Sequence, residues 1–554
     1  MATQPFSVLK SRLFIFCLWI GGLALALTFQ RLQDAWTSEF GGHPDEAGHY
    51  VTGLFVRDAV AWAGNGLVSG FGEHGAVAGG KAFAEKYYKH YPKIGLGVWP
   101  PFFYLVQAAW TTVAGVSHES MMTLMAVLAG VLAALTGGFA AKEMDWKWGV
   151  RAAVILGVLP LMQMYSAMVM AEVLSGVLML AAMLYLGKFL EAEKLRHALW
   201  FGLFAALAIL TKGTGLALVF AAPLTIALSR KWGALRRPGL WMGVAIIGLV
   251  AGPWTWKTRA LGHGGWIYPS PCWAFTSNAL PYYANQLLVA TGWLLMAAAL
   301  IGLISLFKKP SARPAMWAAL IALVPSAWAF QSIAPVGMEA RHLLPTLPCM
   351  VLLAVRGAWW ISSAWRFGSI AAFAMLVLFA FGPWMQPQGA RHFASIGNQA
   401  ALSPFRVVPK AIHGYSDVAE RVMADAGNNR KLLVSGDVKG EGMMISEVAM
   451  RDEARPSWEV QRASKALGQS QWRGGEYREL FRDGAGLAEF LNKEKFGFII
   501  VDDAISKDKW RPHHQLLHDA LELLSSQSAV QLVKEFPLER SGREEQPLEL
   551  WKLQ

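Results

Sequence analysis

Long apolar stretches recur along the first two thirds of the chain, and they constrain the fold more than any other feature. A helix of about 20 mostly apolar residues crosses the hydrocarbon core of a bilayer. About eleven stretches approach this length: 13–27, 118–141, 152–169, 171–190, 198–211, 213–229, 240–257, 288–307, 314–331, 342–361 and 366–385. Because a spanning segment must satisfy its own backbone hydrogen bonds, we predict a polytopic α-helical membrane protein with about eleven transmembrane helices.

The first apolar stretch could be a signal peptide or a membrane anchor. It follows Lys10 and Arg12, and Ala24-Leu25-Ala26 is typical of a cleavage site. We favour an uncleaved anchor because many further spans follow it.

Composition supports a membrane protein and argues against some partners. Only 16% of the residues are charged, against roughly 25% in soluble domains. The net charge of +12 could indicate a nucleic-acid partner. However, the Lys and Arg residues lie largely in short loops, where they orient helices in a bilayer, so we predict no nucleic-acid partner. The three cysteines, Cys17, Cys272 and Cys349, predict no disulfide framework.

The charges of the loops predict the orientation. Five short loops are basic, with Lys142, Lys147 and Arg151; Lys188, Lys194 and Arg196; Arg230, Lys231, Arg236 and Arg237; Lys308, Lys309 and Arg313; and Arg356 and Arg366. The positive-inside rule makes them and the N-terminus cytoplasmic. The loop 30–117 and the C-terminus are then extracytoplasmic. This parity requires 100–116 to be a surface helix, which the helix-starting pair Pro100-Pro101 favours.

A short stretch in the first loop, Gly42-His43-Pro44-Asp45-Glu46-Ala47-Gly48-His49-Tyr50, carries two adjacent carboxylates. Charges held beside a bilayer are costly, so they indicate a functional site by default. We interpret Asp45 and Glu46 as the reaction centre. The alternative is a solvated Pro-Asp turn at the exit of a helix.

Further polar residues are predicted to share the extracytoplasmic face: Glu172, Lys212, Lys257, Arg259, Glu339, Arg341, His342 and the cluster Tyr87–Lys93, which contains Tyr91. The aromatic and cationic cluster suits a sugar or a phosphate as well as a membrane interface. Each residue also has a structural explanation: Arg341 could snorkel to the interface, Lys212 could end a helix, and Glu172 could complement a helix dipole.

The sequence changes character after about Gln386. Buried strands are predicted at 431–435, 496–501 and 529–536, and helices at 485–493 and 514–526. We therefore predict a transmembrane domain at 1–387 and an extracytoplasmic α/β domain at 388–554. The glycine-rich stretch 434–442 does not match the dinucleotide-binding pattern. In the irregular segment 454–482, Arg455, Arg462, Arg473, Trp458 and Trp472 could guide an acceptor, unless the domain only caps the membrane part.

Several short motifs resemble the membrane-embedded glycosyltransferases of the C superfamily. They are Pro44-Asp45-Glu46, Trp99-Pro100-Pro101-Phe102-Phe103-Tyr104, Met170-Ala171-Glu172, Leu210-Thr211-Lys212-Gly213, Gly252-Pro253-Trp254 and Arg341-His342-Leu343-Leu344-Pro345. The sequence is most similar to the protein O-mannosyltransferases and the lipid A aminoarabinose transferases, the family 39-like group, over about residues 10–385.

The resemblance implies an inverting transfer of a sugar from a polyprenyl-phosphate donor to a hydroxyl of a glycan, lipid or protein. It implies that Asp45 is the base and that Glu46 supports the site. Lys212, Arg259 and Arg341 could bind the donor phosphate through charge-assisted hydrogen bonds. Glu172, His49, Tyr91 and His342 are candidate substrate contacts. The implied setting is the cell membrane and polysaccharide biosynthesis in the cell envelope.

The sequence departs from the aminoarabinose transferases at two points. These enzymes carry Arg-Tyr two residues beyond the motif, where this chain has Gly48-His49, and a Lys before the Pro pair, where this chain has Trp99. Lys93 is the candidate substitute for that Lys. We expect no required cofactor, although Asp45 and Glu172 could hold Mg²⁺ or Mn²⁺.

Two other classes of function stay open. A transporter or lipid flippase would also place charges in apolar sequence, but the chain lacks the internal symmetry of paired halves. A non-catalytic anchor would use its C-terminal domain alone.

Overall fold

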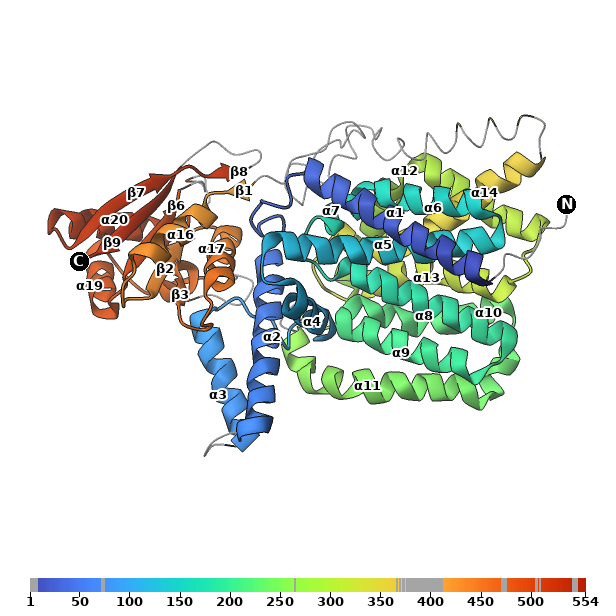
Figure 1. The fold of residues 1–554 in the computed structure, drawn as a ribbon, viewed down its shortest axis with the longest axis horizontal. Coiled ribbons are helices and arrows are strands. Elements are labelled where there is room, and N and C mark those ends of the chain that lie inside the picture. Colours follow the sequence, from blue (N-terminus) through green and yellow to red (C-terminus); the bar gives the residue numbers. More distant parts are fainter. Residues whose placement is uncertain are drawn as a thin grey trace. The chain divides into compact units, whose positions relative to one another are not determined.

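The computed structural model describes residues 8–554 apart from 71–74, 264–265, 365–366, 368–369, 371–373, 375–411, 470–475, 504–506, 508–509 and 541–546. Figure 1 shows the fold as a ribbon. The chain forms two compact units. Unit 1 contains Met1–Gln33, Gly97–Phe103 and Met122–Val408, and unit 2 contains Asp34–Leu96, Tyr104–Met121 and Pro409–Gln554.

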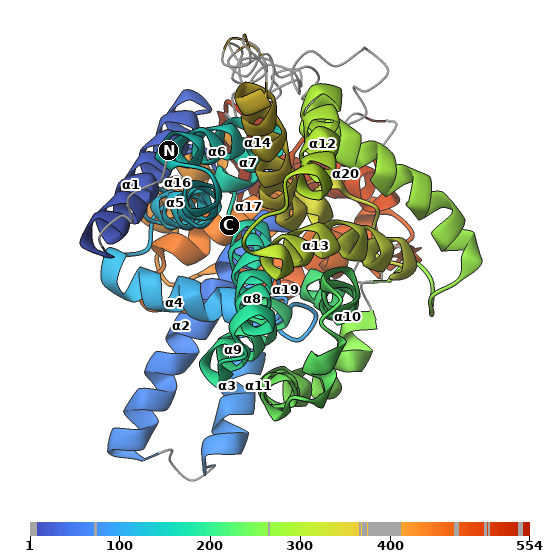
Figure 2. The same ribbon diagram turned by 90° about the vertical axis from the view of Figure 1, so that its right-hand side faces the viewer.

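Unit 1 is a bundle of helices. Its elements are α1 (Val8–Leu32), most of α5 (His118–Glu143), α6 (Trp146–Val158), α7 (Pro160–Ser166), α8 (Glu172–Ala192), α9 (Leu195–Thr211), η1 (Gly213–Ala217), α10 (Leu218–Ser229), η2 (Trp232–Arg236), α11 (Pro238–His263), α12 (Trp273–Lys308), α13 (Pro314–Ile333), η3 (Ala340–Thr346) and α14 (Leu347–Ala364). Helix α8 packs against α9 and α13, and α9 against α11 (Figure 2). Since α8 is buried on nearly all sides, it is the core of the bundle.

The membrane-protein fold predicted from the apolar stretches is confirmed. Six described helices are long and apolar enough to span a bilayer, and two bent helix pairs raise this number to eight. The shorter apolar helices Phe102–Ala114, Leu195–Thr211 and Gly213–Ser229 add to them. Ten of the eleven predicted spans coincide with helices of unit 1, and the span at 366–385 lies almost entirely outside the described residues. The total of eleven stays a prediction.

The predicted span 152–169 is not one straight helix. It consists of α6 and α7, which are bent by 68° at Leu159. Pro160 explains the break, because the residue before a proline avoids the helical conformation. Leu159 is extended, with φ −62° and ψ 134°. A second span, α12, contains Gly292 with φ 74° and ψ 152°, a conformation that favours glycine.

Unit 2 contains a mixed five-stranded sheet. Its order is β3 (Glu459–Arg462), β2 (Lys431–Ser435), β6 (Phe498–Asp502), β9 (Leu548–Leu553) and β7 (Val530–Phe536). The first three strands are parallel, and β9 pairs antiparallel with both β6 and β7. The helices are α16 (Tyr415–Asp425), α17 (Val438–Arg451), α18 (Ala463–Ala466), α19 (Gly484–Glu494) and α20 (Pro512–Ser526). Strands β2, β6 and β7 and helices α19 and α20 lie where the sequence predicts them.

Two short pairings complete the described strands of unit 2. Strand β1 (Ile412–His413) pairs with β8 (Glu539–Arg540), and β4 (Gly468–Gln469) pairs with β5 (Arg478–Glu479). A buried core of Leu433, Ile499 and Val501 from the sheet and Leu517 and Leu521 from α20 joins the sheet to its helices.

The first loop folds together with the C-terminal residues in unit 2. It forms α2 (Glu46–Ser69), α3 (Gly75–His90) and most of α4 (Phe102–Ala114). Helix α2 packs against α17, and α3 against β3. The Tyr91 hydroxyl donates to the Asp452 carboxylate at 2.5 Å, and Arg455 pairs with Asp58 at 3.1 Å. The predicted domain 1–387 includes this loop, whereas in the structure the loop packs on the α/β fold of unit 2.

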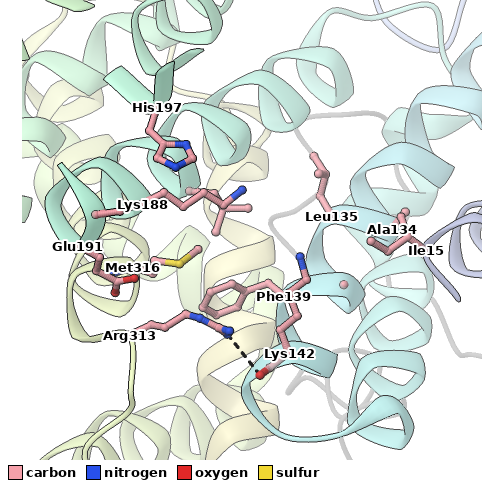
Figure 3. Close-up of a pocket in the computed structure, with 13 residues that line it drawn as sticks. Ile15, Ala134, Leu135, Phe139, Lys142, Lys188, Glu191, His197, Arg313 and Met316 are labelled. Atoms are coloured by element: carbon pink, nitrogen blue, oxygen red, sulfur yellow. Dashed lines mark hydrogen bonds between the residues drawn. The ribbon is translucent and has the colours of Figure 1, made fainter. Parts of the chain in front are cut away.

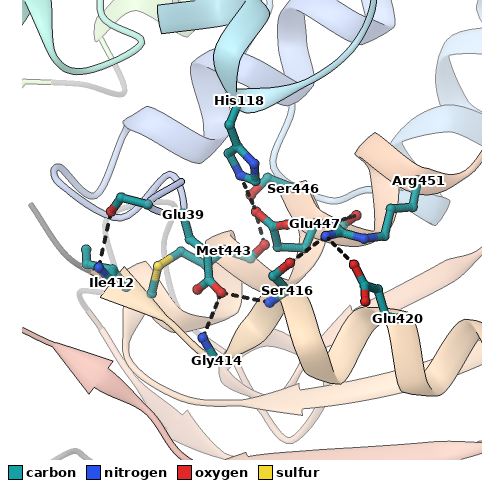
Figure 4. A network of polar contacts seen from close by, with 11 residues as sticks. Glu39, His118, Ile412, Gly414, Ser416, Glu420, Met443, Ser446, Glu447 and Arg451 are labelled. Atoms are coloured by element: carbon teal, nitrogen blue, oxygen red, sulfur yellow. Dashed lines mark hydrogen bonds and ion pairs between the residues drawn. The ribbon is translucent and has the colours of Figure 1, made fainter. Parts of the chain in front are cut away.

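A buried polar network strengthens this packing (Figure 4). The Glu39 carboxylate accepts hydrogen bonds from the Gly414 and Ser416 amides at 2.9 and 2.7 Å, at the start of α16. A carboxylate at a helix N-terminus is favourable because it satisfies orphan amides and complements the helix dipole. The ring of His118 contacts Glu447 at 2.8 Å. Glu39 of the first loop and His118, the first residue of α5, therefore contribute partners to two C-terminal helices.

Candidate functional site

The Asp45 turn begins helix α2 and gives its two carboxylates different environments. The Glu46 side chain is fully buried, and its carboxylate accepts from the Gly42 amide at 2.8 Å. The Asp45 amide donates to the His43 ring at 3.0 Å, and the Asp45 carboxylate lies 3.6 Å from that ring. The Asp45 side chain is 32% exposed. Glu46 thus holds the turn, and Asp45 is the carboxylate that a substrate could reach.

Lys93 is a buried cation in electrostatic contact with Asp45. Its ammonium donates to the Val438 carbonyl of α17 at 3.2 Å, and its side chain is 6% exposed. Burial, and then the positive charge of Arg462, lower the pKa of Lys93 to about 8, while the negative charges of Glu441 and Asp45 oppose this shift. A lysine with this pKa keeps its charge at neutral pH and loses it in mildly alkaline solution.

Gly442 explains how α17 approaches this site. A Cβ at Gly442 would lie 3.1 Å from Lys93 Cε and 3.3 Å from Ala47 Cβ. Any side chain there would displace Lys93 or the start of α2. The glycine-rich stretch of the C-terminal residues therefore permits a close helix approach, and Lys439 adds a hydrogen bond to the Gly42 carbonyl at 3.2 Å.

His49 and Tyr91 are buried and already paired inside unit 2. His49 Nδ1 lies 2.6 Å from the Tyr104 hydroxyl, and Tyr91 donates to Asp452. Burial, and then the charge of Asp452, raise the pKa of Tyr91. These contacts position α2 and the segment before Lys93, which is a supporting role for both side chains.

A second cluster of charges, in unit 1, forms where three elements begin or end. Glu172 is the first residue of α8, Lys212 follows the last residue of α9, and Arg341 lies in η3. Lys212 forms an ion pair with Glu172, and Arg341 Nε lies 3.4 Å from the same carboxylate. Glu339 pairs with Arg341 at 2.7 Å. We call these four residues the Glu172 cluster.

The Glu172 cluster balances two cations with two carboxylates. The Glu172 side chain is 1% exposed and the Lys212 side chain 19% exposed. A buried charge without a partner is costly, so each cation needs a carboxylate or another anion. A phosphate could therefore bind here by replacing the carboxylate of Glu339, whose side chain is 26% exposed, as the partner of Arg341. His342 lies beside the cluster and contacts the Tyr283 hydroxyl at 3.0 Å.

Known proteins resemble this chain in part of its sequence and in its fold. Residues 98–256 match the family model described as dolichyl-phosphate-mannose-protein mannosyltransferase. No curated protein matches the sequence. ArnT from Cupriavidus metallidurans, solved with undecaprenyl phosphate, matches with a TM-score of 0.58 at 13% identity, over 96% of this chain and 97% of that chain.

The chain has the fold of the membrane-embedded glycosyltransferases. The archaeal oligosaccharyltransferase AglB from Archaeoglobus fulgidus, solved with an inhibitory peptide and a dolichol-phosphate, also matches. Its TM-score is 0.51 at 12% identity, over 98% of this chain and 77% of that chain. The predicted resemblance to this superfamily is confirmed. The fold match extends it beyond residue 385 into the C-terminal part, which the motifs did not cover.

Arg259 is predicted to bind the donor phosphate together with Lys212 and Arg341, but its neighbours in the structure are different. It lies exposed on α11, and its guanidinium stacks over Trp256 at 3.9 Å. Among the described residues it forms no ion pair and does not contact the Glu172 cluster. The cation nearest Glu172 besides Lys212 is Arg341.

Two further groups lie close to the sites. Glu339 is predicted to share the extracytoplasmic face with Arg341, and the structure pairs the two side chains. Arg462 is predicted as an acceptor contact, whereas in the structure it pairs with the buried Glu441 at 2.8 Å and acts on Lys93, a role that could not be predicted because 369 residues of sequence separate the two cations. Of the proposed acceptor contacts, Arg455, Arg462 and Trp458 are turned into the fold, and Trp472 and Arg473 lie outside the described residues.

The described residues offer one group of three metal-type ligands, Asp503, His518 and Glu549, in the C-terminal part. His518 and Asp503 already form an ion pair at 3.0 Å. Asp45 and Glu172 belong to different units, and a shared ion stays a prediction.

Proposed function

We propose that the protein is an inverting glycosyltransferase that moves a sugar from a polyprenyl-phosphate donor to a hydroxyl acceptor on the extracytoplasmic face of the cell membrane. Two observations support the class of donor. The fold matches ArnT over nearly the whole of both chains, and that enzyme was solved with undecaprenyl phosphate. The matched family model is that of mannosyltransferases that use dolichyl phosphate mannose.

The environment of Asp45 carries the proposed chemistry. Its carboxylate is partly exposed at the start of α2, while the neighbouring Glu46 is buried and fixed. The acceptor oxygen forms a bond to the anomeric carbon as Asp45 takes the hydroxyl proton. The bond from the anomeric carbon to the phosphate oxygen breaks, and polyprenyl phosphate leaves with the electron pair. Phosphate is a good leaving group, so no general acid is needed.

Two separate groups of cations are candidates for binding the donor phosphate, one in each unit. In unit 2, Lys93 supplies a positive charge in electrostatic contact with Asp45. In unit 1, Lys212 and Arg341 supply charge-assisted hydrogen bonds, for which the phosphate replaces a carboxylate. Glu172 and His342 contact the donor sugar, whereas His49 and Tyr91 act through the packing of α2.

The test is transfer by purified protein from a panel of labelled polyprenyl-phosphate sugars. Asp45→Asn keeps the size of the side chain and should reduce turnover by about 10²-fold or more, the scale of a general base. Glu85→Gln, an exposed carboxylate of the same loop that pairs with Lys81, is the matched control and should be unchanged. Full activity of Asp45→Asn would refute the role of Asp45.

The same assay separates the alternative function, a transporter or lipid flippase. Broken helices are a feature of transporters, and the bent pairs α6–α7 and α12 are consistent with one. A flippase would move the labelled donor across a vesicle membrane and leave the sugar–phosphate bond intact. Release of polyprenyl phosphate with a labelled product identifies the glycosyltransferase. We propose no metal requirement, and turnover should survive a chelator.

A further inference from the structure

A cavity of about 300 Å³ in unit 1 is lined by side chains of several helices. Leu135, Phe139 and Lys142 come from α5, Lys188 and Glu191 from α8, and Arg313 precedes α13. His197 of α9 lies at the same cavity, as Figure 3 shows. Three of the five basic loops thus bring cations to one place.

Two of these cations, Lys142 and Lys188, form no ion pair among the described residues. The Lys188 ammonium lies over the ring face of Tyr185, at 4.3 Å. Their mutual repulsion, with that of Arg313, acts on Lys188. Arg313 itself is neutralised by Glu143, at 2.8 Å.

The remaining charges leave the cavity positive. Glu191 lines it, and its carboxylate accepts from the Met316 amide at 3.4 Å. The Lys142 and Lys188 ammonium groups therefore exceed Glu191 by one positive charge. The Nδ1 atom of His197 is buried and has no hydrogen-bond partner within the described part of the chain. An anion with one negative charge and several acceptor oxygens would satisfy these groups.

We propose that this cavity binds the phosphodiester headgroup of an anionic phospholipid. Lys142 and Lys188 would bind the phosphate oxygens, and His197 would donate a hydrogen bond. The apolar wall of Leu135 and Phe139 would pack against the upper acyl chain. Basic pockets between transmembrane helices bind anionic headgroups in this way. A soluble phosphate-type anion could bind the same cations, but it would have no acyl chain to pack against the apolar wall.

The bound lipid would join α5, α8 and α13 at the end of the bundle that carries the basic loops. This site differs from the proposed donor sites, because none of its lining residues belongs to the Glu172 cluster or to unit 2. Its role is to bind a structural lipid and not to take part in transfer.

Native mass spectrometry of the purified full chain with added phosphatidylglycerol or phosphatidylcholine tests the proposal. We expect retention of phosphatidylglycerol over phosphatidylcholine. Lys142→Gln/Lys188→Gln should reduce this retention about tenfold or more, and Lys142→Arg/Lys188→Arg should keep it. Lys147→Gln, an exposed lysine of the same loop that does not line the cavity, is the control and should match the parent protein.

Three results would overturn the proposal. The first is equal retention of both lipids by the parent protein. The second is undiminished phosphatidylglycerol binding by the Gln double variant. The third is complete displacement of the lipid by millimolar inorganic phosphate, which would identify a soluble anion as the occupant. Gel filtration checks that each variant is folded.

Discussion

Replacing Lys93 with methionine should make the protein more stable and less active at neutral pH. The pKa of Lys93 falls from 10.5 to about 8 in the folded protein. This shift of about 2.5 units corresponds to about 3.4 kcal/mol at 1.36 kcal/mol per unit. Loss of the hydrogen bond to the Val438 carbonyl offsets about 1 kcal/mol of that gain. We therefore expect the free energy of unfolding to rise by about 2 kcal/mol.

The pH dependence gives the sign of this effect. Below pH 8 the ammonium is charged in both the folded and the unfolded state, and the folded state carries the full unfavourable term. Between about 8 and 10.5 the folded state loses the proton first, so the wild-type protein regains stability as the pH rises. Above 10.5 both states are neutral. The advantage of Lys93→Met should therefore be largest below pH 8 and fade above it.

Thermal unfolding of the purified protein from pH 6.5 to 10 measures this difference, and donor turnover is followed over the same range. If the charged Lys93 binds the donor phosphate, wild-type turnover should fall as the pH rises through about 8. Lys89→Met, an exposed lysine of α3 paired with Glu459, is the control. A Lys93→Met protein that is less stable below pH 8, or fully active, would refute the reasoning.

Three further outcomes follow from the structure. Lys212→Ala should lower donor use and destabilise the protein by about 1.5–3 kcal/mol, the scale of a hydrogen bond to a charged group, because Glu172 then keeps only Arg341 as a cation. Lys212→Ala/Glu172→Ala should recover stability but not donor use, and equal melting temperatures of both variants would contradict this. Removal of residues after Gln388 should abolish all turnover, including hydrolysis of the donor, since Tyr91, Asp58 and Glu39 lose buried partners; surviving hydrolysis would contradict it. In a cysteine-free background, Lys147→Cys and Asn428→Cys, both at exposed positions, should be labelled from opposite sides of the membrane; labelling from one side would refute the topology.

The membrane fold could be predicted because its signal is local. A run of apolar residues specifies a spanning helix without reference to the rest of the chain, as in α5 and α8. The break at Leu159 could also be predicted, because Pro160 follows it. The apolar run by itself does not indicate this break. The strands β2 and β6 were predictable for the same local reason, as short buried runs that start after polar turns.

The surroundings of the candidate site could not be predicted. The sequence singles out Asp45 and Lys93, but the pKa of Lys93 depends on Arg462 and Glu441, which are distant in sequence. Likewise, the partner of Tyr91 is Asp452. No pattern in the first loop indicates such partners, because single-sequence periodicity reports which face is buried and not what buries it. The pairing of Lys212 with Glu172 could not be predicted for the same reason.

The first loop packs on the C-terminal fold, and this packing limits when the loop can fold during synthesis. Tyr91 and Asp452 are 361 residues apart in sequence. At roughly 5–20 residues per second, the ribosome needs roughly 20–70 s between them. During that interval the loop that carries the Asp45 turn has been synthesised, but its partner Asp452 has not. A nascent chain halted before Asp452 would carry the complete Asp45 motif without the residues that bury its loop, so the proposed site can form only late in synthesis.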